Sequence, residues 1–353
     1  MTNLLAGDLD HVLALTQGVW EELREARLFV TGGTGFFGCW LLESFAWACD
    51  HLHLAATMTV LSRSPEAFRD KAPHLAGHPS IRWIAGDVRT FPFPAGRFTH
   101  CIHAATEASA ALNREKPLLM LDTIVEGTRR SLDFAVSSNV HRFLLISSGA
   151  VYGAQPAALS HLPEDHAGGP DVTDARWVYG EGKRLAELLT SVYSRQHRLD
   201  CPIARPFAFT GPYLPLDTHF AIGNFIADCI HERPIEIRGG GTAVRSYLYA
   251  ADLVIWLWTI LVHGQSRRAY NVGSEEAVSI AGLASTVQQA LGARQPVRIA
   301  GQAPPVPGDR YVPDTARARN ELGLEQCIPL DEAIRRTAQW HAVPAAIRGE
   351  VRA

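Results

Sequence analysis

Three glycines at a spacing of three residues, Gly32, Gly35 and Gly38, constrain the fold of this chain of 353 residues more than any other feature. They lie in TGGTGFFG (residues 31–38), after the apolar run RLFVTG and before residues 36–50, which have helical spacing. Glycine permits a sharp turn, close approach of a pyrophosphate and tight packing of a helix on a strand. The following helix N-terminus offers free N–H groups to an anion. The pattern predicts a dinucleotide-binding turn; a merely structural glycine turn is the alternative.

Strands and helices alternate along the first half of the chain, which predicts a doubly wound parallel sheet of the Rossmann type. The fold class is therefore α/β, with a smaller C-terminal substrate-binding lobe, because prolines, glycines and short elements dominate after Gly211. The expected strands are RLFVTG, TMTVLSR, IRWIAGD, FTHCIHAA, RFLLISSG and CPIARPFAFTG, with helices at 36–50, 117–138 and 178–197. The expected domains are an N-terminal helical extension (1–26), a dinucleotide-binding domain (27–211, to which 249–272 return) and the substrate lobe (212–248 and 273–345).

Composition narrows the function classes. The formal net charge is −3 with 20% charged and 47% apolar residues, and no basic stripe indicates nucleic acid. No run of about 20 apolar residues predicts a membrane span, and the N-terminus has no basic segment of a secretory signal. The six cysteines form no CxxC pair, so we expect no metal site and no disulfide framework, and a cytoplasmic location. The first 26 residues suggest an amphipathic helix docked on the body or on a partner subunit.

The end of the second expected strand, VLSRS, bears on which ribose the turn accepts. An acid about 20 residues after the glycines would bind the 2′-hydroxyl of NAD, but Ser62 and Arg63 stand there instead. A guanidinium can meet a 2′-phosphate, which favours NADP slightly over NAD; alternatively, Arg63 lies over the adenine with either cofactor. Asp87, after the third expected strand, either reaches the adenine edge or caps a turn.

A second constellation follows the fifth expected strand, where Ser148 lies in SSGAVYG (147–153). Tyr179 and Lys183, in YGEGK, are four residues apart and share one face of the next helix. A nearby ammonium and an oxidised nicotinamide both favour a phenolate and would lower the pKa of Tyr179. Such a tyrosine can take a proton from a sugar hydroxyl or give one to a carbonyl, and Ser148 would hydrogen-bond the same oxygen.

With these motifs, residues 27 to about 340 resemble the extended short-chain dehydrogenases/reductases of the nucleotide-sugar epimerase/dehydratase kind. The resemblance is carried by TGGTGFFG, HAA (103–105), SSGAVYG, YGEGK, RPFAFTGP (205–212), RSYLYAADL (245–253) and PGDRYVPD (307–314). It implies NAD(P) as cofactor, a nucleoside-diphosphate sugar as substrate, and Ser148, Tyr179 and Lys183 as the catalytic triad. It also implies that Arg245 and Arg310 hold the diphosphate, although from the sequence alone they would be surface arginines.

The resemblance extends to further contacts. The expected cofactor contacts are Gly32, Thr34, Gly35, Phe36, Phe37, Gly38, Ser62, Arg63, Asp87, Val88, Ala104, Ala105, Thr106, Tyr179, Lys183, Pro206 and Phe207. The expected substrate contacts are Glu107, Ser148, Gly149, Asn224, Arg245 and Arg310.

The departures from the family pattern bear on the reaction. The 4,6-dehydratases of this family have an acidic pair after the catalytic hydroxyl, and the sugar-acid decarboxylases have a glutamate at the second position. Gly149 and Ala150 occupy these positions and transfer no proton. Glu107 is a nearby alternative acid, or a loop charge. Ala208 and Ile124 replace asparagines that are usual in the family, which affects the expected substrate contacts.

The family resemblance, rather than any single residue, favours an epimerase that acts through a transient keto-sugar, with Tyr179 as acid and base. An NADPH-dependent 4-keto-sugar reductase is the alternative. A dehydratase or decarboxylase would need relocated acid and base groups, and a non-catalytic redox-sensing module is disfavoured by the intact triad. The family resemblance also implies a homodimer through the helices at 117–138 and 178–197, the first of which is strongly apolar; a helix buried within the monomer would look the same.

Overall fold

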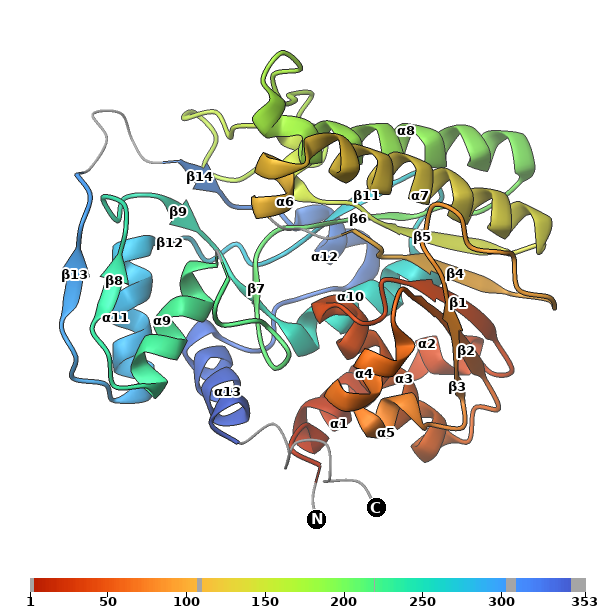
Figure 1. The fold of residues 1–353 in the computed structure, drawn as a ribbon, viewed down its shortest axis with the longest axis horizontal. Helices are drawn as coiled ribbons and strands as arrows, with labels where there is room; N and C mark the ends of the chain where they lie inside the picture. The colour runs from red at the N-terminus through yellow and green to blue at the C-terminus, as the bar shows by residue number, and fades with distance from the viewer. Residues whose placement is uncertain (1–2, 107–109, 219, 303–308, 344–353) are drawn as a thin grey trace.

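A seven-stranded sheet with the order β3-β2-β1-β4-β5-β6-β11 forms the core of the larger part of the molecule (Figure 1). The computed structural model describes residues 3–106, 110–218, 220–302 and 309–343. All six neighbouring strand pairs are parallel, so the predicted doubly wound sheet is confirmed, with β11 added at the β6 edge. The strands are β1 (Arg27–Thr31), β2 (Thr57–Ser62), β3 (Ile81–Ala85), β4 (His100–His103), β5 (Arg142–Ile146), β6 (Ile203–Pro206) and β11 (Ala269–Val272).

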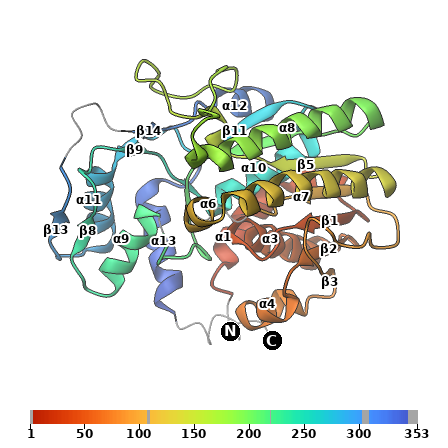
Figure 2. The same ribbon diagram turned by 45° about the horizontal axis from the view of Figure 1, so that its top comes forward.

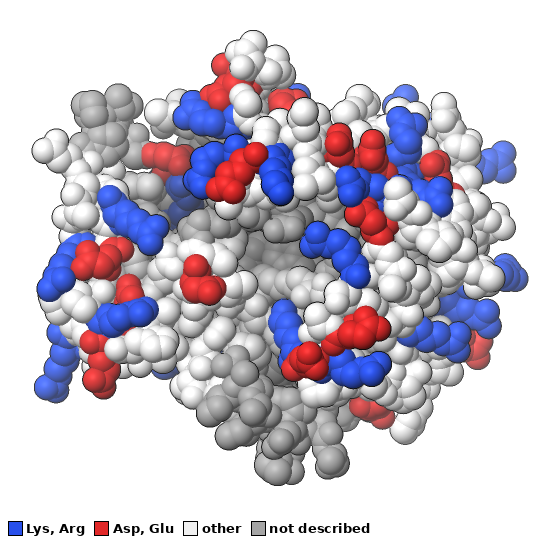
Figure 3. Space-filling model, in the orientation of Figure 1, with Lys and Arg blue, Asp and Glu red and all other residues white. Residues whose placement is uncertain are grey.

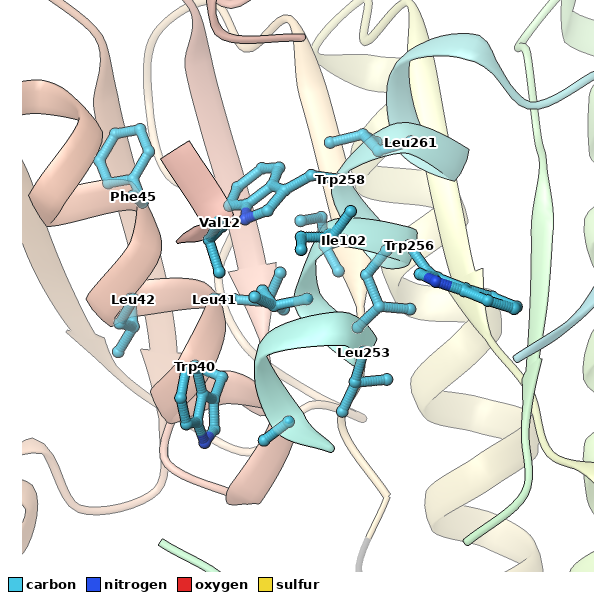
Figure 4. Packing of buried hydrophobic residues seen from close by; sticks show 14 of the residues in the cluster. Val12, Trp40, Leu41, Leu42, Phe45, Ile102, Leu253, Trp256, Trp258 and Leu261 are labelled. Carbon is cyan, nitrogen blue, oxygen red and sulfur yellow. The ribbon is translucent and has the colours of Figure 1, made fainter. Parts of the chain in front are cut away.

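Helices cover both faces of this sheet because successive strand side chains point to opposite sides. Leu28 and Val30 of β1 belong to the hydrophobic cluster under one set of helices, and Phe29 between them packs on the other side. Figure 4 shows part of the first cluster, where Trp40 and Trp258 come from two different helices. The first set is α3 (Phe36–Leu52) and α10 (Ala250–His263); the second is α7 (Pro117–Ser137) and α8 (Val178–His197), which lie side by side in Figure 2.

The N-terminal segment forms two short helices rather than the single helix expected. The first, α1 (Ala6–Leu15), is followed by its C-cap Thr16, whose buried hydroxyl donates to the Val12 carbonyl, and α2 (Gln17–Glu22) comes next. Both pack on α10, where the Trp20 and Trp258 rings lie 4.9 Å apart. The extension is therefore docked on the body of the chain.

A smaller lobe with its own hydrophobic cluster is formed by segments on both sides of β11 in the chain and lies beside the central sheet (Figure 1). A three-stranded sheet with the order β12-β9-β14 also belongs to this lobe. Its helices are α9 (Ala221–Ile230), α11 (Ile280–Leu291) and α13 (Leu330–Ala342); its strands are β8 (Ile235–Ile237), β9 (Val244–Arg245), β12 (Val278–Ser279), β13 (Val297–Ile299) and β14 (Arg310–Tyr311).

The sixth expected strand is divided in the structure. β6 ends at Pro206, which lacks the N–H of a ladder residue, and β7 (Phe209–Thr210) pairs in parallel with β10 (Leu248–Tyr249) instead. The short elements that complete the described chain are α4 (Pro65–Lys71), α5 (Pro73–Ala76), α6 (Ala110–Glu115), α12 (Ala316–Leu322) and the 3₁₀ turns η1 (Gly149–Tyr152) and η2 (Ala175–Trp177). Among the helices of the described residues, none combines the length and the apolar character that crossing a membrane requires.

Candidate active site

The turn between β1 and α3 depends on its glycines for close packing. Gly32 has a positive φ of +76°, and a Cβ there would lie 2.5 Å from the carbonyl oxygen of Ala104. A Cβ on Gly38 would lie 2.4 Å from the carbonyl oxygen of Gly32. The first turn of α3 therefore packs directly on Gly32 and Gly33, and Gly32 packs on the residue that follows β4, as a phosphate-binding turn of this type requires.

The outer side of the same turn is open. Gly35, the N-cap of α3, is exposed, and a Cβ there would meet nothing nearer than the Gly32 carbonyl oxygen at 3.5 Å. The first N–H groups of α3 have no partners within the helix and point toward this side. Phe36 and Phe37 begin the helix, and the Phe37 ring packs edge-on against Phe209. The residues present therefore fit the pyrophosphate of a dinucleotide.

The carboxyl ends of β2 and β3 form the expected adenosine end of the site. The Ser62 hydroxyl accepts the N–H of Ser64 at 3.2 Å, and Arg63 is exposed beside it. Both carboxylate oxygens of Asp87 accept from the Arg89 guanidinium at 2.9 Å, and Arg89 with its backbone N–H holds the pKa of Asp87 at about 2. Asp87 is thus engaged within its own turn, and Arg63 is close enough to lower its pKa further. The buried Val88 lies against Gly127 of α7.

The segment after β4 lines the turn from the other side. The N–H of Ala104 donates to the Thr31 carbonyl and that of Ala105 to the Thr31 hydroxyl, at 3.2 Å each. Thr106 follows, with its hydroxyl donating to the Ala105 carbonyl. The expected substrate residue Glu107 lies outside the described residues. Ala104 and Ala105 are therefore held against β1, beside Gly32.

Ser148 connects two phenols. It is the N-cap of η1 and its hydroxyl oxygen accepts the Ala150 N–H at 3.1 Å. Burial raises the pKa of both Tyr179 and Tyr311, and a hydrogen bond with Ser148 partly offsets this in each. A serine hydroxyl has one proton and two lone pairs. With one lone pair taken by Ala150, Tyr311 can donate to the second while the serine proton points to the Tyr179 oxygen.

Lys183 lies one helical turn beyond Tyr179 on α8, as expected. Its ammonium nitrogen is buried, lies 6.0 Å from the Tyr179 ring centre and donates to the Ile146 carbonyl at 2.8 Å. Burial lowers the pKa of Lys183 to about 7, against an opposing effect of Glu187. The sequence led us to expect a lowered pKa for Tyr179, whereas in the chain itself burial raises it, and Ser148 supplies the offsetting interaction. A further positive charge near Tyr179 would be needed to favour its phenolate form.

A buried polar network supports the end of β5 below this group. The Ser147 hydroxyl donates to Glu187 at 2.6 Å, and Arg205 of β6 donates to both carboxylate oxygens of Glu187. Arg205 also donates to the Tyr152 hydroxyl, which donates to Asn271 of β11. The network ties α8, β6 and β11 to the segment that presents Ser148.

The two arginines expected to hold a diphosphate lie on different faces. β14 pairs with β9 so that Tyr311 is opposite Arg245, and Arg310 is opposite Val244. Because side chains alternate along a strand, Tyr311 and Arg245 share one face. Arg245 donates to Asp309, whereas Arg310 donates to the Ser160 carbonyl at 2.6 Å. The structure therefore brings Arg245, and not Arg310, toward the phenols.

Tyr311 is the residue of this group that the sequence analysis missed. Its ring lies 4.5 Å from that of Phe207, after Pro206 at the end of β6. A Cβ on Gly149 would meet the Tyr311 hydroxyl oxygen at 2.5 Å and the Phe207 ring at 2.8 Å. Gly149 is buried, so Tyr311 and Phe207 take the space that a side chain at position 149 would need. Asn224, half-buried on α9, lies in the smaller lobe.

Figure 3 shows how charged side chains are distributed on one face of the molecule. Lysine and arginine side chains are interspersed with aspartate and glutamate, and a recess lies near the centre of the face. The mixed charge agrees with the formal net charge of −3 and with a small-molecule site rather than a nucleic-acid surface on this side.

The glycine turn lies between the first strand of a doubly wound sheet and its helix, and a Ser–Tyr–Lys group lies at the carboxyl edge of the same sheet. These features define a dinucleotide-dependent enzyme of the short-chain dehydrogenase/reductase class. The model of the "NAD dependent epimerase/dehydratase family" matches residues 28–273, and the chain belongs to this family. Its members are enzymes, so the expectation of an NAD(P)-dependent enzyme is confirmed at the level of the family.

Individual relatives differ in the reaction that they are named for. UDP-glucuronic acid decarboxylase 5 of Arabidopsis thaliana is 29% identical over 308 residues, 87% of each chain. The UDP-glucose 4-epimerase of Thermotoga maritima has a similar fold, with a TM-score of 0.76 at 20% identity over 89% of this chain and 98% of that one. The dTDP-glucose 4,6-dehydratase of Streptomyces venezuelae, solved with NAD bound, gives 0.75 at 24% identity over 89% and 96%.

Proposed function

We propose that this chain epimerises a nucleoside-diphosphate sugar through a transient keto-sugar. The observation that carries the proposal is the group around Ser148, in which Tyr179 is present and the neighbouring positions hold Gly149 and Ala150. Tyr179 can exchange a proton with one sugar hydroxyl. Gly149 and Ala150 carry no group that could exchange a proton at a second carbon. The reversible oxidation of a single carbinol needs only the exchange at the hydroxyl.

Each residue of the group has a role in this reaction. Tyr179 takes the proton from the reacting ring hydroxyl and later returns it. Ser148 directs its own proton to the tyrosine oxygen and so holds the phenol in place for this exchange. Lys183 holds the Ile146 carbonyl and fixes α8 against β5. Bound NAD(P) supplies the hydride acceptor and donor, and in its oxidised form a positive charge that favours the Tyr179 phenolate.

Decarboxylation of a UDP-sugar acid is a second candidate, favoured by the similarity to the Arabidopsis thaliana decarboxylase over 87% of this chain. Elimination or decarboxylation in this family uses an acidic side chain after the catalytic hydroxyl. At position 149 the side-chain space is taken by Tyr311 and Phe207, and Ala150 has no carboxylate. The local geometry therefore supports epimerisation, or the related reduction of a 4-keto-sugar, which needs the same residues.

We propose that the chain binds NADP slightly more tightly than NAD. Arg63 is exposed at the carboxyl end of β2, where an acid would bind a ribose 2′-hydroxyl. Competitive binding of the two dinucleotides to the purified chain measures this preference. We further propose that the lobe of residues 212–248 and 273–345 binds the nucleotide part of the substrate, with Arg245 on its phosphates and Asn224 nearby.

A homodimer is the proposed assembly. On α7, Leu118 is 73% and Leu119 is 36% exposed; on α8, Leu188 is 60% exposed. With Leu185 and Val192 these side chains give the neighbouring helices an apolar outer face. Two copies of this face would form the four-helix contact that the family resemblance implies.

Chromatographic separation followed by mass spectrometry, with a panel of nucleotide sugars, tests the reaction. The purified enzyme is incubated without and then with added cofactor. An isomer without a change in mass supports the epimerase, and loss of carbon dioxide or water would overturn it. Turnover that begins only when NADPH is added, with a gain of two hydrogens on a keto-sugar, would assign the reductase instead.

Tyr179→Phe tests the role of the phenol. We expect the variant to retain dinucleotide binding and to lose turnover, because the ring remains but the proton acceptor is removed. Turnover at the wild-type rate would refute the proposed role. Tyr193→Phe is the matched control, since Tyr193 lies on the same helix and its hydroxyl donates to Asp133, outside the Ser148 group.

A further inference from the structure

A histidine, an aspartate and a cysteine from three distant parts of the chain meet on the side of the sheet opposite α8. His11 lies on α1, Asp252 in the first turn of α10, and Cys327 in the connection between α12 and α13. The imidazole nitrogen, carboxylate oxygen and sulfur of these side chains all lie within 4.8 Å of one another. None of the three belongs to the Ser148 group.

Two of these atoms are buried without a hydrogen-bond partner among the described residues. The Asp252 side chain is fully buried; its Oδ2 accepts the N–H groups of Cys327 and Ile328, but its Oδ1 has no partner. The Nε2 of His11 is likewise unpartnered and lies 3.6 Å from that Oδ1, longer than a hydrogen bond. Buried polar atoms are nearly always satisfied, so such a pair indicates a ligand or ion between them.

We propose that His11, Asp252 and Cys327 bind a zinc-class divalent cation. Tetrahedral zinc with bonds of about 2.0–2.3 Å sets ligand atoms about 3.3–3.6 Å apart. The 3.6 Å separation of His11 and Asp252 is already near that spacing. Imidazole, carboxylate and thiolate together suit zinc better than magnesium or calcium, which prefer oxygen ligands. The thiol proton of Cys327 passes to solvent on binding, and the fourth position is left for water.

The surroundings give a cation access and a structural role. Cys327 is exposed, and a cavity of about 380 Å³ bounded by Thr16, Ile255 and Cys327 opens beside it. The bound ion would connect α1 to α10 and to the segment before α13. This proposal replaces the expectation of no metal site, which was based only on the spacing of the cysteines.

Thiol protection in the full-length chain tests the site. All six cysteines lie within the described residues, and Cys327 alone is exposed, so the thiol reagent DTNB reports on it in the native protein. After treatment with EDTA, we expect added zinc at ten times its dissociation constant to slow the modification about tenfold, and one zinc per chain to remain after desalting. Magnesium should give no protection.

Variants separate the site from nonspecific thiol binding. In His11→Ala, zinc protection and zinc retention should both be lost; in Cys327→Ser, retention should be lost. His263→Ala is the matched control, because His263 also lies 3.6 Å from a carboxylate, that of Glu22, but no thiol completes the set. It should behave as the wild type. Equal protection in His11→Ala, or no effect of zinc on the wild type, would overturn the proposal.

Discussion

The contact between Gly149 and Tyr311 gives the sharpest test of the site geometry. Gly149→Ala adds one methyl group that would lie 2.5 Å from the Tyr311 hydroxyl oxygen and 2.8 Å from the Phe207 ring. Ordinary contacts of a Cβ lie near 3.4–4 Å, so both rings must shift by up to about 1 Å. Overpacking of this kind costs about 1–3 kcal/mol. We expect the free energy of unfolding to fall by that amount.

Urea denaturation measures the change, compared with Gly18→Ala as the control. Gly18 lies in α2 and an added Cβ there meets nothing within 4 Å, so this substitution should be neutral or stabilise by up to about 1 kcal/mol. A second comparison uses Tyr311→Phe, which removes the hydroxyl that is nearest to the added methyl group. In that background Gly149→Ala should cost less, with a coupling of about 0.5–3 kcal/mol. Equal costs in both backgrounds would refute the contact.

Three further predictions concern the surroundings of the site. The pKa of Lys183 is about 7 in the folded chain, against an ordinary value near 10.5. Between these pH values the unfolded chain binds more protons, so the free energy of unfolding should rise by about 2–3 kcal/mol from pH 7 to 9. Urea denaturation at several pH values measures this rise, which should be absent in Lys183→Met. Arg205→Met leaves the largely buried Glu187 carboxylate without its cationic partner, with only the Ser147 hydroxyl bonded to it, and thermal and urea unfolding should show a loss of about 3–5 kcal/mol; a loss below about 1 kcal/mol would contradict the network. Leu188→Glu places a charge on the apolar face of α8 and should shift the chain from dimer to monomer in light scattering, whereas Arg195→Glu, at the far end of α8, should not; a wild-type monomer would refute the dimer itself.

Local patterns predicted the parts of the molecule that depend on neighbours in the sequence. The glycine spacing identified the turn before α3, and the four-residue spacing of Tyr179 and Lys183 placed both on one helix face. Six of the seven central strands, all but β11, were predicted because each is a short apolar run bounded by turn residues. Such features require only the period of a helix or strand.

Contacts that depend on tertiary pairing were not predictable in the same way. The strand β14 has only two residues, so no period shows that Tyr311 faces the site and Arg310 does not. That assignment follows from the pairing of Tyr311 with Arg245 on β9, in a different part of the chain. The family resemblance implied Arg310 as a diphosphate contact, in agreement with the usual pairing of a guanidinium with a phosphate.

The missing acid after Ser148 and the presence of Tyr311 are two aspects of one arrangement. A carboxylate at position 149 and the phenol of Tyr311 would require the same space beside Phe207. Gly149→Asp alone therefore meets Tyr311 before it can approach a sugar, and should destabilise the chain without supplying an acid. A dehydratase-like site would need a smaller residue at position 311 as well. Because two positions distant in sequence must change together, the glycine is better explained as part of a packed phenol site than as the isolated loss of an acid.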